Sequence, residues 1–137
     1  MSGPDFLADL LGAITKFHDF TIKQHGGLPG LRDEGLLHLS IERPWMTAFG
    51  RPLFDTPFRR AAAIAEAITR NHPFNDGNHR SGLAAAHLLL GLFGIRLVAS
   101  ADEQRDWIRS LGSGNVNLDE FTAWLERNSV LRARDAD

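Results

Sequence analysis

The stretch NHPFNDGNHRSG, residues 71–82, concentrates side chains whose types suit chemistry on a phosphate. Asp76 is a hard oxygen ligand of the kind that Mg²⁺ takes, usually together with substrate phosphates and several waters. Asn78 can donate from its side-chain amide, and Arg80 can clamp phosphate oxygens in two places. Neutral His72 can accept the proton of an attacking hydroxyl near pH 7. The stretch therefore predicts a phosphate site that faces a general base.

The surroundings of this stretch predict a tight loop between two helices. Pro73 disfavours helical dihedrals at the preceding His72, and a strongly apolar helix follows the stretch. The first amides of that helix are unpaired, and the helix dipole adds positive charge there, so an anion is attracted. Phe74 is expected to plug into the core and fix the loop. The predicted phosphate-binding residues are Gly77, Asn78, His79 and Arg80.

Apolar periodicity and capping signals predict an all-α bundle of about six helices in a single domain. The apolar run SGLAAAHLLLGLFG, residues 81–94, is expected to form the helix in the middle of the core. Residues 45–56 lack helical periodicity and predict a flap, either a loop or a short hairpin. The other expected helices cover residues 6–25, 33–42 and 57–72, then one after the Ser100 cap and one after the Asn117 cap.

Composition is that of a soluble single-domain protein of 137 residues, with 43% hydrophobic and 23% charged residues. A net charge of −2 gives no overall attraction to nucleic acid or to an anionic membrane. The apolar segment 83–97 is shorter than the roughly 20 residues that a spanning helix needs. The absence of cysteine excludes disulfides and thiolate metal sites, and the cytoplasm is the expected location. We expect one domain over residues 1–130 and a loose tail over 131–137.

The motif HPFNDGNHR, residues 72–80, resembles the signature of the Fic/Doc family. The upstream segment GGLPGLRDEGLL is similar to the death-on-curing (Doc) branch, and the likeness extends to about Leu97. The resemblance implies a six-helix toxin fold that transfers part of a nucleoside triphosphate to a protein hydroxyl. It implies His72 as the base, Asp76 on Mg²⁺, Phe74 as the loop anchor and Gly77, Asn78, His79 and Arg80 on the phosphates of ATP.

Two positions favour the Doc branch over AMP-transferring Fic proteins, which usually carry Gly at the position of His79 and a second Arg at that of Leu83. The Doc resemblance implies a kinase that moves the γ-phosphate of ATP to a Thr or Ser of a translation protein such as elongation factor Tu. It also implies restraint by a Phd-like antitoxin protein in trans. Doc proteins generally have Lys where this chain has His79, so we expect reduced or pH-dependent nucleotide affinity.

Three alternatives remain open from the sequence. The first is a Fic-type AMP transferase, and the second is a non-catalytic partner-binding domain. The third is a metal-dependent phosphohydrolase of the HD type, built from His18 and Asp19 with His72 and His79. Otherwise His18, like His25 and His38, is expected at or near the surface. Core anchoring is expected for Trp45, a hydrogen-bonded core position for His87, and either an anchoring or a target-binding role for Phe49 and Phe54.

Overall fold

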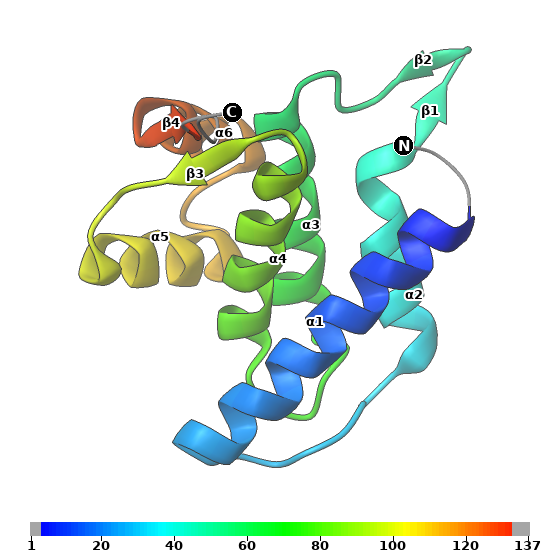
Figure 1. Ribbon diagram of the computed structural model, residues 1–137, viewed down its shortest axis with the longest axis vertical. Helices are drawn as coiled ribbons and strands as arrows, with labels where there is room; N and C mark the ends of the chain where they lie inside the picture. Colours follow the sequence, from blue (N-terminus) through cyan, green and yellow to red (C-terminus); the bar gives the residue numbers. More distant parts are fainter. Residues whose placement is uncertain (1–3, 133–137) are drawn as a thin grey trace, which may run out of the picture.

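The computed structural model describes residues 4–132 and confirms the all-α bundle, with six α-helices in that part of the chain (Figure 1). Two small antiparallel sheets accompany the helices, and the first of them is the hairpin of the predicted flap. The helices are α1 (Pro4–His25), α2 (Glu34–Glu42), α3 (Pro57–Asn71), α4 (Asn78–Leu92), α5 (Ala101–Ser113) and α6 (Leu118–Arg127), with a 3₁₀ turn η1 (Arg43–Trp45). The strands are β1 (Thr47–Ala48), β2 (Arg51–Pro52), β3 (Ile95–Leu97) and β4 (Ser129–Leu131).

Helix α3 is the central helix of the bundle. All its residues from 61 to 69 are buried, and it contacts α2, α4, α5 and α6. Figure 1 shows α3 and α4 side by side, with α1 crossing them. Alanine at five of these nine positions leaves room for the neighbouring helices to come close. Contact with α4 is so tight that a Cβ at Gly82 would lie 2.7 Å from Cγ2 of Thr69 and 3.2 Å from the Ala65 carbonyl.

The predicted central position of the apolar helix after residue 80 is wrong. Helix α4 packs on α3 and also contacts α1, α5 and β3, but its Leu88 and Leu92 are 37% and 39% exposed. The chain also leaves the helix before Ile95 and continues as β3. Burial follows the number of neighbours that can approach, and small side chains on α3 admit more of them than the leucines of α4 do.

Strands β3 and β4 were not expected from the sequence. They pair Ile95 with Leu131 and Leu97 with Ser129, which brings the end of α6 back to the end of α4. The Arg132 amide donates to the Gly94 carbonyl at 2.7 Å. The first two residues of the predicted loose tail are thus held by backbone pairing, and residues 133–137 lie outside the described part. Within residues 4–132, no helix is both long and apolar enough to pass through a membrane.

The aromatic residues of the flap, residues 45–56, differ in how deeply they are buried. Half-buried Trp45 packs edge-on against Phe6, with ring centroids 5.1 Å apart, and Arg60 lies over its ring, which confirms the anchoring role. Phe54 is buried and is therefore an anchor, whereas Phe49 at the hairpin tip is fully exposed with φ of +54°. His87 is hydrogen-bonded as predicted, because Gln104 Oε1 lies 2.7 Å from its Nε2.

Candidate functional site

The loop between α3 and α4 is anchored in the core by Phe74, as predicted. Its side chain is 1% exposed and stacks on the ring of His18, with centroids 3.8 Å apart and planes 9° from parallel. His18 Nε2 donates to the Asp76 carbonyl at 2.8 Å. The expectation of a surface or partly buried His18 is wrong, because this side chain is covered by Phe74 and holds the loop by its polar edge.

Asn78 closes the loop on itself. Its Oδ1 accepts the Phe74 amide and its Nδ2 donates to the Phe74 carbonyl, both at 3.0 Å, while the residue is only 6% exposed. The same Nδ2 lies 3.4 Å from Nδ1 of His72. One amide hydrogen is therefore engaged inside the loop, and the other has only a long contact with His72. The Asn78 side chain thus holds the loop through Phe74, its backbone N–H is a further donor at the start of α4, and its contact with phosphate stays a prediction.

The α1–α2 connection braces the loop from outside, and it contains the GGLPGLRD segment of the sequence. Arg32 donates through Nε to the His72 carbonyl and through Nη2 to the Asn71 carbonyl, each at 2.6 Å. The Leu28 amide donates to Oδ2 of Asp76 at 2.8 Å. These bonds hold the end of α3 and the side chain of Asp76 in fixed positions.

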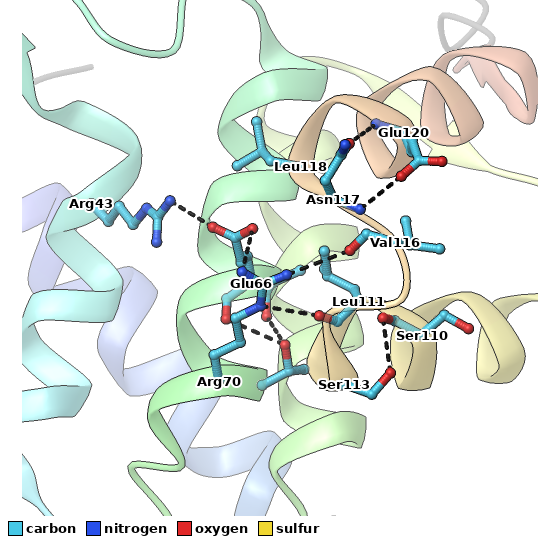
Figure 2. Close-up of polar contacts among 12 residues, drawn as sticks. Arg43, Glu66, Arg70, Ser110, Leu111, Ser113, Val116, Asn117, Leu118 and Glu120 are labelled. Carbon is cyan, nitrogen blue, oxygen red and sulfur yellow. Dashed lines mark hydrogen bonds and ion pairs between the residues drawn. The ribbon is translucent and has the colours of Figure 1, made fainter.

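A second set of contacts fixes the last two turns of α3, through Glu66 and Arg70 (Figure 2). Glu66 has a side chain only 8% exposed and accepts from Arg43 Nη2 at 2.6 Å. Arg70 Nη1 lies 3.4 Å from the other Glu66 oxygen, and its Nε donates to the Leu111 carbonyl at 3.1 Å. Because a buried carboxylate is costly unless it is paired, this network resists displacement. The end of α3 is thereby tied to η1 and to the end of α5.

His72 caps the C-terminus of α3 in a left-handed conformation, with φ of 52° and ψ of 59°. Few non-glycine residues adopt this conformation, and strain of this kind gathers at functional sites. The imidazole is exposed, as a proton acceptor must be. The Asn78 amide favours the ring form with a lone pair on Nδ1 and the hydrogen on Nε2. At 3.4 Å this contact opposes exchange of the two ring forms only weakly.

Helix α4 starts without any side-chain cap. Its N-cap is Gly77, in the left-handed region with φ of 76°, and glycine has no side chain to accept from the first turn. The backbone N–H groups of Asn78, His79 and Arg80 precede the first amide with an intrahelical partner. They remain directed outward beside the exposed Arg80 side chain. The start of α4 therefore offers three unpaired backbone donors where the sequence predicts a phosphate.

This helix start opens into a cleft of about 1040 Å³. Residues 76–80 form one wall, the end of α1 with His25 forms another, and α5 contributes Gln104, Arg105 and Arg109. Among the described lining residues, Asp76 is the single acid. A local basic cleft thus exists on a chain of net charge −2. His72 is outside this lining but lies next to it, with its ring centroid 6.4 Å from that of His79.

His79 lies against α5. A Cβ at Gly112 would be 2.9 Å from its Nε2, so the ring lies close against the backbone of Gly112. Partial burial lowers the pKa of His79, and electrostatic repulsion from its neighbours His72 and Arg109 lowers it further. The ring is therefore mainly neutral at pH 7 in the free protein.

The structure thus brings the sequence-predicted residues together around one opening, with Phe74 beneath and His72 beside it. Sequence reasoning missed His18, Arg32, Arg105 and Arg109. Arg32 stands within the GGLPGLRDEGLL segment that carries the Doc resemblance, which was a usable signal. No signal in the sequence indicated Arg109, because its position depends on how α5 packs.

The HD-type hydrolase alternative finds no support in these contacts. It requires His18 at a metal, but this ring is stacked under Phe74 and donates to a backbone carbonyl. Within residues 4–132, no three His, Asp or Glu side chains gather as metal ligands. Magnesium held mainly by substrate phosphates needs no such group.

Fold and site define a helical protein with a tight loop between α3 and α4, an uncapped start of α4 that opens into a cleft, and an exposed histidine beside that cleft. The chain matches the Fic/DOC family over residues 10–90. It is 34% identical over 102 residues to "Toxin Doc" of Mycolicibacterium smegmatis, covering 73% of this chain and 78% of that protein. It is 31% identical over 114 residues to "Protein kinase doc" of Escherichia phage P1, covering 83% and 89%. This chain belongs to the Fic/Doc family.

Proposed function

We propose that this protein is the toxin of a toxin–antitoxin pair and a kinase that transfers the γ-phosphate of ATP to a Ser or Thr hydroxyl. The proposed target is a translation protein such as elongation factor Tu, in the cytoplasm. The observation that carries the proposal is the uncapped start of α4, which opens into a basic cleft beside His72. The names of the two relatives, a toxin and a protein kinase, support the same choice.

The triphosphate would bind at the start of α4. The backbone N–H groups of residues 78–80 supply donors, and the helix dipole and Arg80 supply positive charge. These donors are preorganised because the loop is fixed by Phe74, Asn78 and Arg32. Positioning and charge neutralisation are the main demands of phosphoryl transfer, so a small rigid loop suffices.

Asp76 fits the role of magnesium ligand. Its Oδ2 accepts from Leu28, and within residues 4–132 its other carboxylate oxygen has no hydrogen-bond partner. Mg²⁺ binds through one or two carboxylates plus substrate phosphates, and it would neutralise phosphate charge at this place. The Leu28 amide keeps the carboxylate at the edge of the cleft.

His72 would take the proton of the acceptor hydroxyl. The hydroxyl oxygen forms a bond to the γ-phosphorus, the bond from that phosphorus to the β–γ bridging oxygen breaks, and ADP leaves. The proton passes from the hydroxyl to Nε2 of the imidazole, in the ring form with its lone pair there, which the long Asn78 contact at 3.4 Å opposes only weakly. The left-handed backbone at His72, held by Arg32, keeps the ring at the side of the cleft.

Incubation with γ-labelled or α-labelled ATP and purified elongation factor Tu tests the proposal. Label from the γ-position alone is expected. A His72→Asn variant should lose about 10²- to 10⁴-fold in rate, and Asn tolerates the left-handed backbone. His38→Asn on α2, where the histidine is 51% exposed and outside the cleft, is the matched control and should retain its rate.

Each of the other outcomes has a definite meaning. Label from the α-position would replace the kinase by an AMP transferase. Full activity of His72→Asn would remove the base assignment. If no label reaches any protein of a bacterial lysate from either nucleotide, the alternative of a non-catalytic partner-binding domain holds instead.

We also propose a Phd-like antitoxin as the partner in trans. An apolar groove of about 450 Å³ between α1 and α4 adjoins the cleft and is lined by Phe17, Leu83 and Leu88. Arg80 and Leu83 line both the groove and the cleft. An amphipathic antitoxin helix in this groove would reach the phosphate site. Co-expression with the antitoxin should restore growth, and Leu88→Glu should weaken that rescue without lowering the transfer rate.

A further inference from the structure

The phosphate site has a shortage of permanent positive charge. Of the residues at the start of α4, Arg80 alone is always charged, because position 79 is histidine and position 83 is leucine. A partly buried His79 has a lowered pKa, so it adds little charge at pH 7. A nucleoside triphosphate carries several negative charges along its phosphate chain. Arg80 and the Mg²⁺ proposed at Asp76 offset only part of this charge, so a further cation from elsewhere in the fold would strengthen binding.

Helix α5 forms the wall opposite the start of α4, and Arg109 is an exposed residue of that wall. It stands three positions before Gly112, the residue against which the His79 ring packs. Its charge also reaches His79, since it contributes to the lowered pKa of that ring. Arg109 and His79 thus face the same space from two different helices.

Arg109 differs from four other arginines of the core and the cleft in its pairing. Arg43 and Arg70 bind Glu66, Arg59 binds Asp119, and Arg105 on the same wall binds Asp102 at 2.9 Å. Arg109 makes no ion pair with any acid in the described range 4–132. Its guanidinium therefore keeps all its donors for a ligand.

We propose that Arg109 binds the phosphate chain of the nucleotide from α5 and supplies the fixed positive charge that residue 79 does not provide. This inference rests on the proposed function of the cleft. Arginine suits the task because its planar guanidinium holds two phosphate oxygens at once. An anion between Arg109 and His79 would also remove the repulsion between these two groups.

Calorimetric titration of the full chain with ATP, with inorganic tripolyphosphate and with adenosine tests this role. Arg109→Gln should weaken ATP and tripolyphosphate binding by about tenfold or more, the usual effect of losing a charge-assisted hydrogen bond. Adenosine binding should not change. Arg127→Gln, at the exposed end of α6 away from the cleft, removes the same charge and should leave all three affinities as they are.

A rescue variant strengthens the test. Adding His79→Lys to Arg109→Gln should restore most of the lost tripolyphosphate affinity, because it returns a fixed charge to the other wall. Wild-type affinity of Arg109→Gln for ATP, or an equal loss for adenosine, would overturn the inference while leaving the proposed function intact. Failure of the wild-type chain to bind either ATP or tripolyphosphate would overturn both.

Discussion

Among the five α-helices whose starts lie wholly within the described residues, α2 to α6, four starts are closed by side chains and one is open. Asp33, Thr56, Ser100 and Asn117 each accept the backbone N–H three residues later, at the starts of α2, α3, α5 and α6. The start of α4 has Gly77 and no side-chain acceptor. The same unpaired amides therefore serve stability at four places and remain available to a ligand at the fifth.

Conformational strain distinguishes the open start as well. His72 and Gly77, at the two ends of the α3–α4 loop, both have positive φ, whereas the caps at the four closed starts are in the extended region. A loop with such a strained backbone keeps its conformation only if contacts with other segments hold it. Here Arg32 and His18 do so from two other segments of the chain. At each closed start, the capping hydrogen bond lies within four consecutive residues and needs no contact with another segment.

The largest effect is expected where the open start depends on glycine. Gly77→Ala should lower the free energy of unfolding by about 1–2 kcal/mol, because alanine disfavours the left-handed backbone at φ of 76°. Gly12→Ala in the middle of α1, where nothing lies within 4 Å, should instead stabilise the protein by about 0.5–1 kcal/mol. Urea unfolding followed by circular dichroism measures both, and a gain at Gly77 would contradict the assigned geometry.

A smaller effect is expected at a closed start. Asn117→Ala removes the cap of α6 and one half of its capping box with Glu120, and should cost about 1 kcal/mol of stability. The Kd for ATP should stay at the wild-type value, since α6 does not line the cleft. A change in Kd of severalfold would show that the closed starts are not separate from ligand binding.

The smallest effect concerns charge at the open start. Because the pKa of His79 is lowered, its ring is neutral above about pH 6.5, the ordinary value, and gains its proton only at lower pH. Bound phosphate favours the protonated ring, so ATP affinity should rise severalfold as the pH falls from 8 to below 6. His79→Lys should bind more tightly at pH 8 and lack this dependence.

The protonation of ATP also changes in this range, so the contribution of His79 has to be measured as a difference between two proteins. The difference in Kd between wild type and His79→Gln isolates the contribution of His79, and a difference that is constant from pH 8 to pH 5.5 would contradict it. The stability of the free protein depends on pH in the opposite direction to ATP affinity, because it falls when His79 is protonated. Protonation of His79 opposes folding, so its contribution to stability is complete above the ordinary value and is lost as the pH falls through the lowered pKa.

Local signals in the sequence predicted well where neighbouring residues decide the structure. The Asn117 capping box formed with both of its hydrogen bonds. Ser100 caps α5 as expected, but Glu103 does not complete a box, because its carboxylate accepts the indole N–H of Trp124 at 2.8 Å instead. A tertiary partner thus overrides a local one when it offers a hydrogen bond at a more buried place.

The sequence by itself determined the helices and most of their caps. It also determined the order, from His72 to Arg80, of the residues predicted to act on a phosphate. Each of these features depends on residues within a few positions. Only the tertiary structure decided that α3 is the central helix, that the Asn78 side chain locks the loop, and that α5 carries Arg109 to the cleft. The physical reason is distance along the chain. Packing of small side chains sets which helices approach one another, and no local pattern encodes that choice.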